Sequence, residues 1–215
     1  MDDSRKKMRD IHDEVPPDYY DTSMATNPFQ RFWHTQRVKV ISEMLRSEGG
    51  LMLDIGCAGG TLLGLIRKKA GLRTTIGIDA SFEAIKYAKA HHKGPGFLCA
   101  DFYELPFKDS TFGCVSAIEV LEHLMDPALA LKELNRCLKK GGSLVILVPN
   151  ERNLLFRMIW YFWTLGKGKV WKDAHVQQFT RESMGRLLSS EGFKVTETRM
   201  FILGMLMAMK GVKEK

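Results

Sequence analysis

The chain lacks the features of metal-binding, disulfide-linked and membrane-spanning proteins. It has four cysteines among 215 residues, and none of them forms a CxxC motif. Their spacing indicates neither a zinc site nor a disulfide framework, and we expect no metal. The first ten residues are charged and lack the apolar core of a signal peptide. The longest apolar run, residues 154–165, contains Arg157 and is shorter than the roughly 20 residues that span a membrane. We therefore expect a cytoplasmic protein.

Two common phosphate-binding motifs are also missing. A dinucleotide-binding GxGxxG turn would need glycine at positions 56, 58 and 61, where the chain has Gly56, Ala58 and Thr61. The GxxxxGK[ST] motif of triphosphate-binding proteins does not occur. The sequence thus disfavours both a pyrophosphate and a triphosphate ligand.

Positive charge is concentrated in the last third of the chain. The net charge is +7, and residues 150–215 contain 12 Lys and Arg against 6 Asp and Glu. This excess favours an anionic acceptor, a membrane surface or nucleic acid as a partner, or a solvated basic face that binds nothing.

Strand and helix patterns alternate from residue 51 onward. We expect strands at 51–55, 74–78, 97–100, 112–118, 143–148, 194–200 and 203–209, and helices at 28–47, 61–70, 81–91, 127–138 and from Thr180 to Gly192. Such alternation predicts a parallel sheet covered on both faces. The last two strands have no helix between them, which predicts an antiparallel hairpin that closes the sheet.

Two segments flank this pattern. Residues 1–27 are polar, contain Pro16 and Pro17 and lack periodicity, so we expect a loose arm there. With the helix that follows, residues 1–48 would form a cover over the cofactor or acceptor, and residues 49–215 the main domain with a lid insertion at about 150–179. The aromatic run 154–165 either packs on the core or forms a wall for an apolar acceptor. In the second case its basic neighbours would face anionic groups; they are Arg152, Arg157, Lys167, Lys169 and Lys172.

Three acids follow or end neighbouring strands and suggest a nucleoside ligand. Asp79 ends the second strand, where its two oxygens could accept hydrogen bonds from the 2′ and 3′ hydroxyls of a ribose. One strand further, Asp101 and Phe102 combine an acceptor for an adenine amino group with a ring that packs on the base. Asp54 ends the first strand, before the glycine turn. For any one acid alone, capping a turn is an equally good explanation.

At this point the chain resembles the class I S-adenosylmethionine-dependent methyltransferases, and in particular the methyltransferase type 11 group that includes the ubiquinone/menaquinone C-methyltransferases. The resemblance rests on LDIGCAGG (53–60), GIDAS (77–81), ADF with LPF (100–107), the stretch 112–126 with Glu122-His123, and GGSLVILVP (141–149). It implies an α/β fold: a Rossmann-like three-layer sandwich with a mostly parallel seven-stranded sheet and an antiparallel last strand.

The resemblance also implies S-adenosyl-L-methionine as methyl donor, S-adenosyl-L-homocysteine as product, and a role for each matching residue. The methionine end would be lined by Asp54, Gly56, Cys57, Ala58 and Gly60. Asp79 would bind the ribose, Ala80 would flank the adenine, and Asp101 with Phe102 would bind it. The backbone at Ile118 and Glu119 would border the sulfonium.

Catalytic residues are less marked, because methyl transfer needs mainly in-line placement and exclusion of water. A general base is required only when the acceptor must lose a proton. His175 is our first candidate, because it lies just before the helix that follows the lid. His34, Tyr19 and Tyr20 are weaker candidates, and Glu119 is either a cofactor neighbour or a structural acid. For His123 a packing role is the favoured interpretation.

We expect a methyltransferase acting on a small-molecule or lipid-like acceptor. The basic last third motivates an RNA or protein methyltransferase as the alternative. Against it, residues 118–123 lack the Asn/Asp-Pro-Pro-Tyr run of the exocyclic-amine and glutamine enzymes, which makes nucleic acid an unfavoured partner. A third hypothesis is a non-catalytic cofactor-binding module on the same fold.

Overall fold

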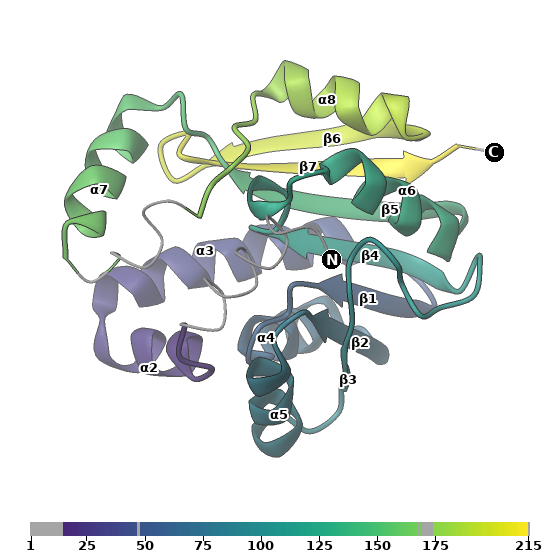
Figure 1. Ribbon diagram of the computed structural model, residues 1–215, viewed down its shortest axis with the longest axis horizontal. Helices are drawn as coiled ribbons and strands as arrows, with labels where there is room; N and C mark the ends of the chain where they lie inside the picture. Colours follow the sequence, from purple (N-terminus) through teal and green to yellow (C-terminus); the bar gives the residue numbers. More distant parts are fainter. Residues whose placement is uncertain (1–14, 47, 167, 169–173, 215) are drawn as a thin grey trace.

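The computed structural model describes residues 15–46, 48–166, 168 and 174–214. One seven-stranded sheet has the order β3-β2-β1-β4-β5-β7-β6, with helices on both sides (Figure 1). The strands are β1 Leu51–Ile55, β2 Thr74–Asp79, β3 Gly96–Cys99, β4 Phe112–Ile118, β5 Leu138–Pro149, β6 Phe193–Phe201 and β7 Leu206–Lys213. The helices are α2 Tyr19–Thr26, α3 Pro28–Leu45, α4 Thr61–Ala70, α5 Phe82–His91, the 3-10 turn η1 Leu121–His123, α6 Pro127–Cys137, α7 Leu154–Thr164 and α8 Arg181–Ser190.

The last strand runs against its neighbours. β1 pairs in parallel with β2 and β4, β2 with β3, and β4 with β5. β7 lies between β5 and β6 and is antiparallel to both. The predicted mostly parallel sheet with an antiparallel last strand is confirmed.

Two apolar cores separate the three layers, and β5 shows how one strand serves both. Leu144, Ile146 and Val148 point into the core under α6 and α8, whereas Val145 and Leu147 point into the core under α3, α4 and α5. This alternation follows from the two-residue period of a strand. Because both faces are buried, the strand has the continuous apolar sequence typical of a central parallel strand.

The chain enters several helices through side-chain caps. Thr180 caps α8, since its hydroxyl accepts a hydrogen bond from the Ser183 amide at 3.1 Å. Asp126 and Asn153 cap α6 and α7 in the same way. These caps fix where α7 and α8 begin at the edge of the sheet, because they satisfy amides that have no partner inside the helix.

The expectation of a loose arm up to residue 27 is wrong for residues 19–26, which form α2. The helix has no buried residue of its own, so its sequence lacks an apolar stripe. Contacts with other parts of the chain stabilise it instead. Tyr87 donates a hydrogen bond to Asp21 at 2.8 Å, and the Tyr20 ring lies 5.1 Å from that of His34.

Two strands also differ from the expected boundaries. β7 begins at Leu206 rather than at residue 203, because Ile202, Leu203 and Gly204 have positive φ angles and form the turn of the hairpin. β5 begins at Leu138, before the glycine pair 141–142, with a register shift in its pairing with β4.

α3 contributes Val38, Ile41 and Leu45 to the same core as α4. The division at residue 48 into a cover and a main domain stays a prediction, as does the lid at about 150–179. Among the described residues, no helix has the length and apolar character needed to cross a membrane.

Candidate active site

A cavity of about 500 Å³ lies where the carboxyl ends of β1, β2 and β4 meet. Gly56 and Ala58 of the turn after β1 line it, together with Asp79 after β2 and Glu119 after β4. Its outer wall comes from α2, α3 and α7, three helices that lie side by side at one end of the sheet in Figure 1. The carboxyl edge of a parallel sheet is the usual place for a ligand in this architecture.

The turn between β1 and α4 allows close approach to its backbone. Gly56, Ala58 and Gly60 have φ angles of +67°, +47° and +84°. A side chain at Gly56 would overlap Val120, and one at Gly59 would overlap the carbonyl oxygen of Pro17. The segment before α2 therefore lies directly over the glycine turn.

Not every residue expected around the methionine end reaches the cavity. Gly56 and Ala58 line it, whereas Asp54, Cys57 and Gly60 do not. Asp54 is buried below the turn and accepts a hydrogen bond from the hydroxyl of Ser116. Burial raises the pKa of Asp54 to about 7, although the bond from Ser116 lowers it.

Asp79 connects the first two strand ends. Its Oδ2 accepts a hydrogen bond from the amide of Ala58 at 2.8 Å, and its Oδ1 accepts one from the amide of Ser81 at 2.9 Å. The carboxylate therefore fixes both turns. An ionised carboxylate has about four acceptor positions, so this role is compatible with binding of ribose hydroxyls at the same oxygens.

Asp101 and Phe102 stand one strand further along the same edge. Both line the cavity, as does Ala80. The Oδ1 of Asp101 accepts a hydrogen bond from the amide of Tyr103 at 2.9 Å, which fixes the orientation of the carboxylate. The structure thus brings the expected ribose and adenine residues to one wall.

A buried ion pair closes the floor beside this wall. The Nη2 of Arg37 lies 2.7 Å from the Oε2 of Glu119, and the Arg37 side chain is 1% exposed. The Nη1 of Arg37 lies 2.9 Å from the Nδ1 of His34. Glu119 has a φ of +53°, a strained value for a residue with a side chain, and this turns the chain out of β4 toward the cavity.

The weaker base candidates are poorly suited to that role. Arginine can only donate, so the Nδ1 of His34 accepts its hydrogen bond and the ring proton lies on Nε2. Burial and the charge of Arg37 lower the pKa of His34 to about 3. Burial also raises the pKa of Tyr19 to about 12 and raises that of Tyr20. These three residues line the cavity, but none of them can act as a base near neutral pH.

His175 occupies the opposite end of the cavity. Its Nδ1 lies 2.6 Å from the Oε1 of Glu151, and its ring stacks on Trp160 with centroids 4.4 Å apart. His123 lies beside it, at 5.0 Å between ring centroids. Beneath them, Glu122 is 1% exposed, and burial raises its pKa well above the usual range.

α7 forms the apolar wall at this end. Phe156, Ile159, Trp160, Phe162 and Trp163 line the cavity. The helix therefore lines the cavity, and its role as a wall for an acceptor stays a prediction. Arg152 and Arg157 are exposed, and the lysines expected beside them at 167, 169 and 172 lie outside the described residues.

Comparison with known proteins agrees with this geometry. Residues 53–146 match the model of a methyltransferase domain family. The chain is 28% identical over 211 residues to the demethylmenaquinone methyltransferase of Chlorobaculum tepidum, which covers 90% of this chain and 87% of that protein. Residues 53–146 of this chain therefore form a methyltransferase type 11 domain.

Two further matches concern the length of a relative and the fold. It is 29% identical over 152 residues to an uncharacterized protein of Methanocaldococcus jannaschii, which covers 70% of this chain, and it spans 64% of that protein's length. A methyltransferase of Haloferax volcanii, solved in complex with the activator Trm112, superposes with a TM-score of 0.78 at 20% identity over 97% of this chain and 98% of that one. The fold is thus the Rossmann-like fold of class I methyltransferases, whose cofactor is S-adenosylmethionine.

Several residues of this site were not predicted from the sequence. Arg37 lies three residues after His34 on the buried side of α3. Because charged residues are seldom buried, an arginine among the buried positions of a helix could have been recognised in the sequence as a candidate site residue. Glu151 and Trp160 are far from His175 in the sequence and contact it only because the chain after β5 folds close to it. No local motif marks that contact.

Proposed function

We propose that this protein transfers the methyl group of S-adenosylmethionine to a small, largely apolar acceptor. The observation that carries the proposal is the continuity of one cavity, from Asp79 and Asp101 at the nucleoside wall to Trp160 and His175 at the far end. Donor and acceptor could therefore meet without intervening water, which favours in-line transfer.

The donor would lie across the strand ends. In this arrangement Asp79 binds the ribose hydroxyls, Ala80, Asp101 and Phe102 hold the adenine, and the Gly56 turn faces the methionine part. The backbone at Ile118 and Glu119 borders the sulfonium. Asp54 and Cys57 lie below the turn, from where the ionised carboxylate of Asp54 would attract the ammonium group of the donor.

The acceptor would bind against α7. Transfer leaves the electron pair of the broken carbon–sulfur bond on sulfur, while the acceptor atom forms the new bond to carbon. Where the acceptor carries a proton, His175 is the base that the geometry favours. The carboxylate of Glu151 holds the Nδ1–H of the ring, so that the Nε2 lone pair can accept a proton and the resulting charge is stabilised.

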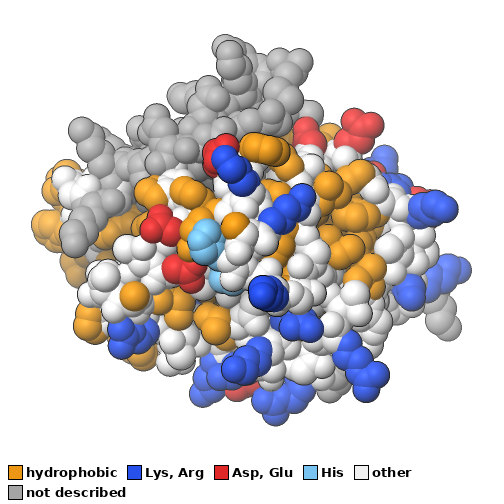
Figure 2. Space-filling view, turned by 90° about the horizontal axis from the view of Figure 1, so that it is seen from below, with side chains coloured by type: hydrophobic (Ala, Val, Ile, Leu, Met, Phe, Trp, Pro, Cys, Tyr) orange, Lys and Arg blue, Asp and Glu red, His pale blue; other side chains and the backbone are white. Residues whose placement is uncertain are grey.

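Apolar side chains on the outer face of α7 support a lipid-like acceptor and contact with a membrane surface. Leu154, Met158 and Tyr161 of the helix, and Leu165 just after it, are between 55% and 74% exposed. The demethylmenaquinone methyltransferase of Chlorobaculum tepidum is named for a lipid quinone, which is of the same chemical class. On the face drawn in Figure 2, the Lys and Arg side chains are scattered over the centre and along the lower and right margins instead of forming one stripe, which gives the RNA alternative little support.

The test is transfer of isotope-labelled methyl groups from S-adenosylmethionine into separate fractions of quinones and other lipids, water-soluble small molecules, RNA and protein. We expect label in a lipid or small-molecule fraction. Trp160→Ala should lower the rate by raising the acceptor KM, whereas Leu65→Ala, at an exposed position of α4 that does not line the cavity, should leave it unchanged. Label confined to RNA or protein would contradict the proposed acceptor. Donor binding without any transfer would favour the non-catalytic module.

A further inference from the structure

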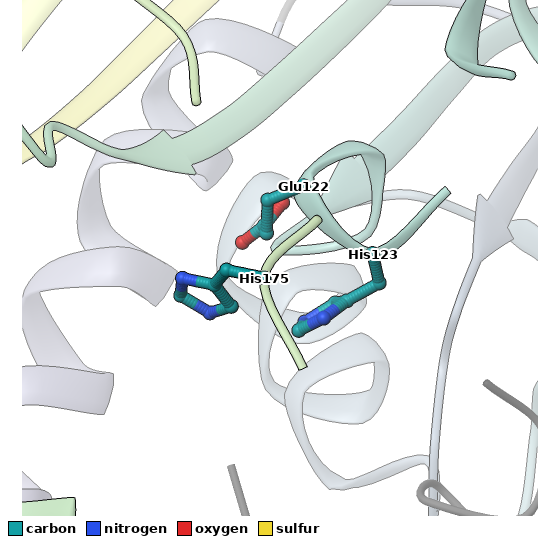
Figure 3. Close-up of side chains that lie close together, drawn as sticks. All are labelled: Glu122, His123 and His175. Carbon is teal, nitrogen blue, oxygen red and sulfur yellow. The ribbon is translucent and has the colours of Figure 1, made fainter. Parts of the chain in front are cut away.

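We propose that Glu122, His123 and His175 bind a divalent transition-metal ion at the acceptor end of the cavity. One potential ligand atom from each residue lies within 4.8 Å of those of the other two. Figure 3 shows the three side chains converging from two segments, the η1 turn and the stretch before α8. The cysteine spacing predicted no metal, and no sequence motif connects residues 122–123 with residue 175.

The backbone fixes these two segments against each other. The carbonyl oxygen of Glu122 accepts hydrogen bonds from the amides of Val176 and Gln177, at 2.9 Å and 3.0 Å. The side chain of Glu122 is thus held opposite His175 by contacts that do not involve either side chain. Such pre-organisation lowers the cost of assembling a metal site.

Both histidines are oriented as metal ligands usually are. The Nδ1 of His123 lies 2.8 Å from the carbonyl oxygen of Ala174, and the Nδ1 of His175 lies 2.6 Å from a carboxylate oxygen of Glu151. Because both oxygens are acceptors, each Nδ1 carries the proton and each Nε2 carries the lone pair. A ring N–H held by a carbonyl or carboxylate is the common outer contact of a metal-binding histidine.

The carboxylate of Glu122 supplies an independent argument. Its side chain is 1% exposed, and neither of its oxygens has a hydrogen-bond partner among the described residues. Burying an ionised carboxylate without a partner is strongly unfavourable. A cation bound directly to this group would remove that cost.

The donor set selects the kind of ion. Two imidazole nitrogens and one carboxylate oxygen suit Zn²⁺, Fe²⁺, Co²⁺ or Mn²⁺ better than Mg²⁺ or Ca²⁺, which prefer oxygen ligands only. Three protein ligands leave at least one coordination position open. His123 and His175 both line the cavity, so we infer that this position faces the acceptor.

What the ion does rests on the proposed function, although its binding does not. An acceptor hydroxyl or enol oxygen bound to the ion becomes more acidic and loses its proton to solvent. For an O-acceptor, the oxygen lone pair then forms the new bond to the methyl carbon, and the carbon–sulfur pair stays on the sulfur of S-adenosylhomocysteine. In this state His175 is a metal ligand, and the ion replaces it as the group that activates the acceptor.

The experiment is calorimetric titration of chelator-treated full-length protein with Zn²⁺, together with Co²⁺ absorption spectra. We expect one ion per chain and ligand-field bands from bound Co²⁺. Glu122→Gln, His123→Gln and His175→Gln should each weaken Zn²⁺ binding by about 100-fold or more. Glu104→Gln and His91→Gln change the same residue types at exposed positions and should leave the affinity within about twofold of wild type.

Two measurements keep this test separate from folding and from methyl transfer. Zn²⁺ should raise the melting temperature of wild type but not of Glu122→Gln, whereas metal-free Glu122→Gln should be at least as stable as metal-free wild type because it removes an ionisable group that is buried without a hydrogen-bond partner. Absence of Zn²⁺ binding by wild type, or equal binding by the three variants, would overturn the proposal. Zn²⁺ binding without S-adenosylmethionine binding would refute the proposed function alone, and the reverse would refute the metal site alone.

Discussion

Arg37 offers a quantitative test of how the floor of the cavity is held. Its guanidinium group is 1% exposed, lies 2.7 Å from Glu119 and donates to His34 at 2.9 Å. Replacement by Met fills much of the same volume but leaves the Glu119 carboxylate without its counter-ion. Removing one partner of a buried ion pair costs about 3–5 kcal/mol of unfolding free energy.

The partial exposure of Glu119 places the expected loss of unfolding free energy at the lower end of that range. Its side chain is 23% exposed, so water can partly solvate the carboxylate once Arg37 is removed. We therefore expect Arg37→Met to lower the free energy of unfolding by about 3 kcal/mol. In a domain of this size that change corresponds to roughly 6–12 °C in melting temperature.

Urea unfolding of matched variants provides the assay. Arg199 pairs with Glu43 at 2.7 Å and Glu197 at 2.6 Å, but its side chain is 34% exposed. Arg199→Met should therefore cost less than about 1 kcal/mol. Adding Glu119→Gln to Arg37→Met should recover part of the loss. Equal losses for Arg37→Met and Arg199→Met would refute the argument that burial determines the value of these pairs.

Three further predictions concern the cavity. The raised pKa of Asp54, about 7, means that S-adenosylmethionine binding should weaken as pH falls below 7, by about threefold or more per unit, and that Asp54→Asn should bind weakly at every pH. Because native Asp54 holds its proton more tightly than the unfolded chain does, this residue should also lower the stability of the donor-free protein as pH rises from about 4 to 7. A flat affinity from pH 6 to 8 in wild-type calorimetry would contradict this assignment. Ala58→Gly should raise the free energy of unfolding by about 0.5–1 kcal/mol, because the φ of +47° strains alanine; a loss of stability in urea unfolding would be inconsistent with that strain. His175→Gln should lower kcat by about 100-fold or more and leave the donor Kd within about twofold, whereas a purely structural histidine would change both in parallel steady-state and binding measurements.

The central strands were predictable because their sequences carry a strong local signal. β1, β4 and the second half of β5 are mostly apolar and buried, as expected for strands covered on both faces, and an acid or a glycine ends or precedes each of them. The start of β7 was not predictable from such a pattern, because it depends on left-handed backbone at Ile202 and Leu203, two residues that seldom adopt it. α2 was missed for a related reason, since a helix without buried residues has no apolar periodicity.

The two ends of the cavity also differ in how well the sequence predicts them. Asp79, Asp101 and Phe102 follow strands at regular intervals, so their position at one edge was predictable from the order of the elements, although their roles toward a donor stay predictions. The other end is assembled from η1, Glu151 and residues 174–176, which meet only in the folded chain. The pairing of Arg37 with Glu119 likewise joins positions 82 residues apart in sequence. Such contacts depend on tertiary packing and leave no motif.

Calorimetric titration of S-adenosylmethionine into the wild-type protein and into Asp79→Ala tests the central claim most directly. The account predicts one donor molecule per chain for wild type and at least about tenfold weaker binding for Asp79→Ala, because hydrogen bonds to a charged group contribute about 1.5–3 kcal/mol. Asp79→Asn keeps one acceptor oxygen and should be intermediate, with circular dichroism confirming that both variants are folded. No binding to wild type, or equal binding to wild type and Asp79→Ala, would contradict the claim that this edge of the sheet holds the methyl donor.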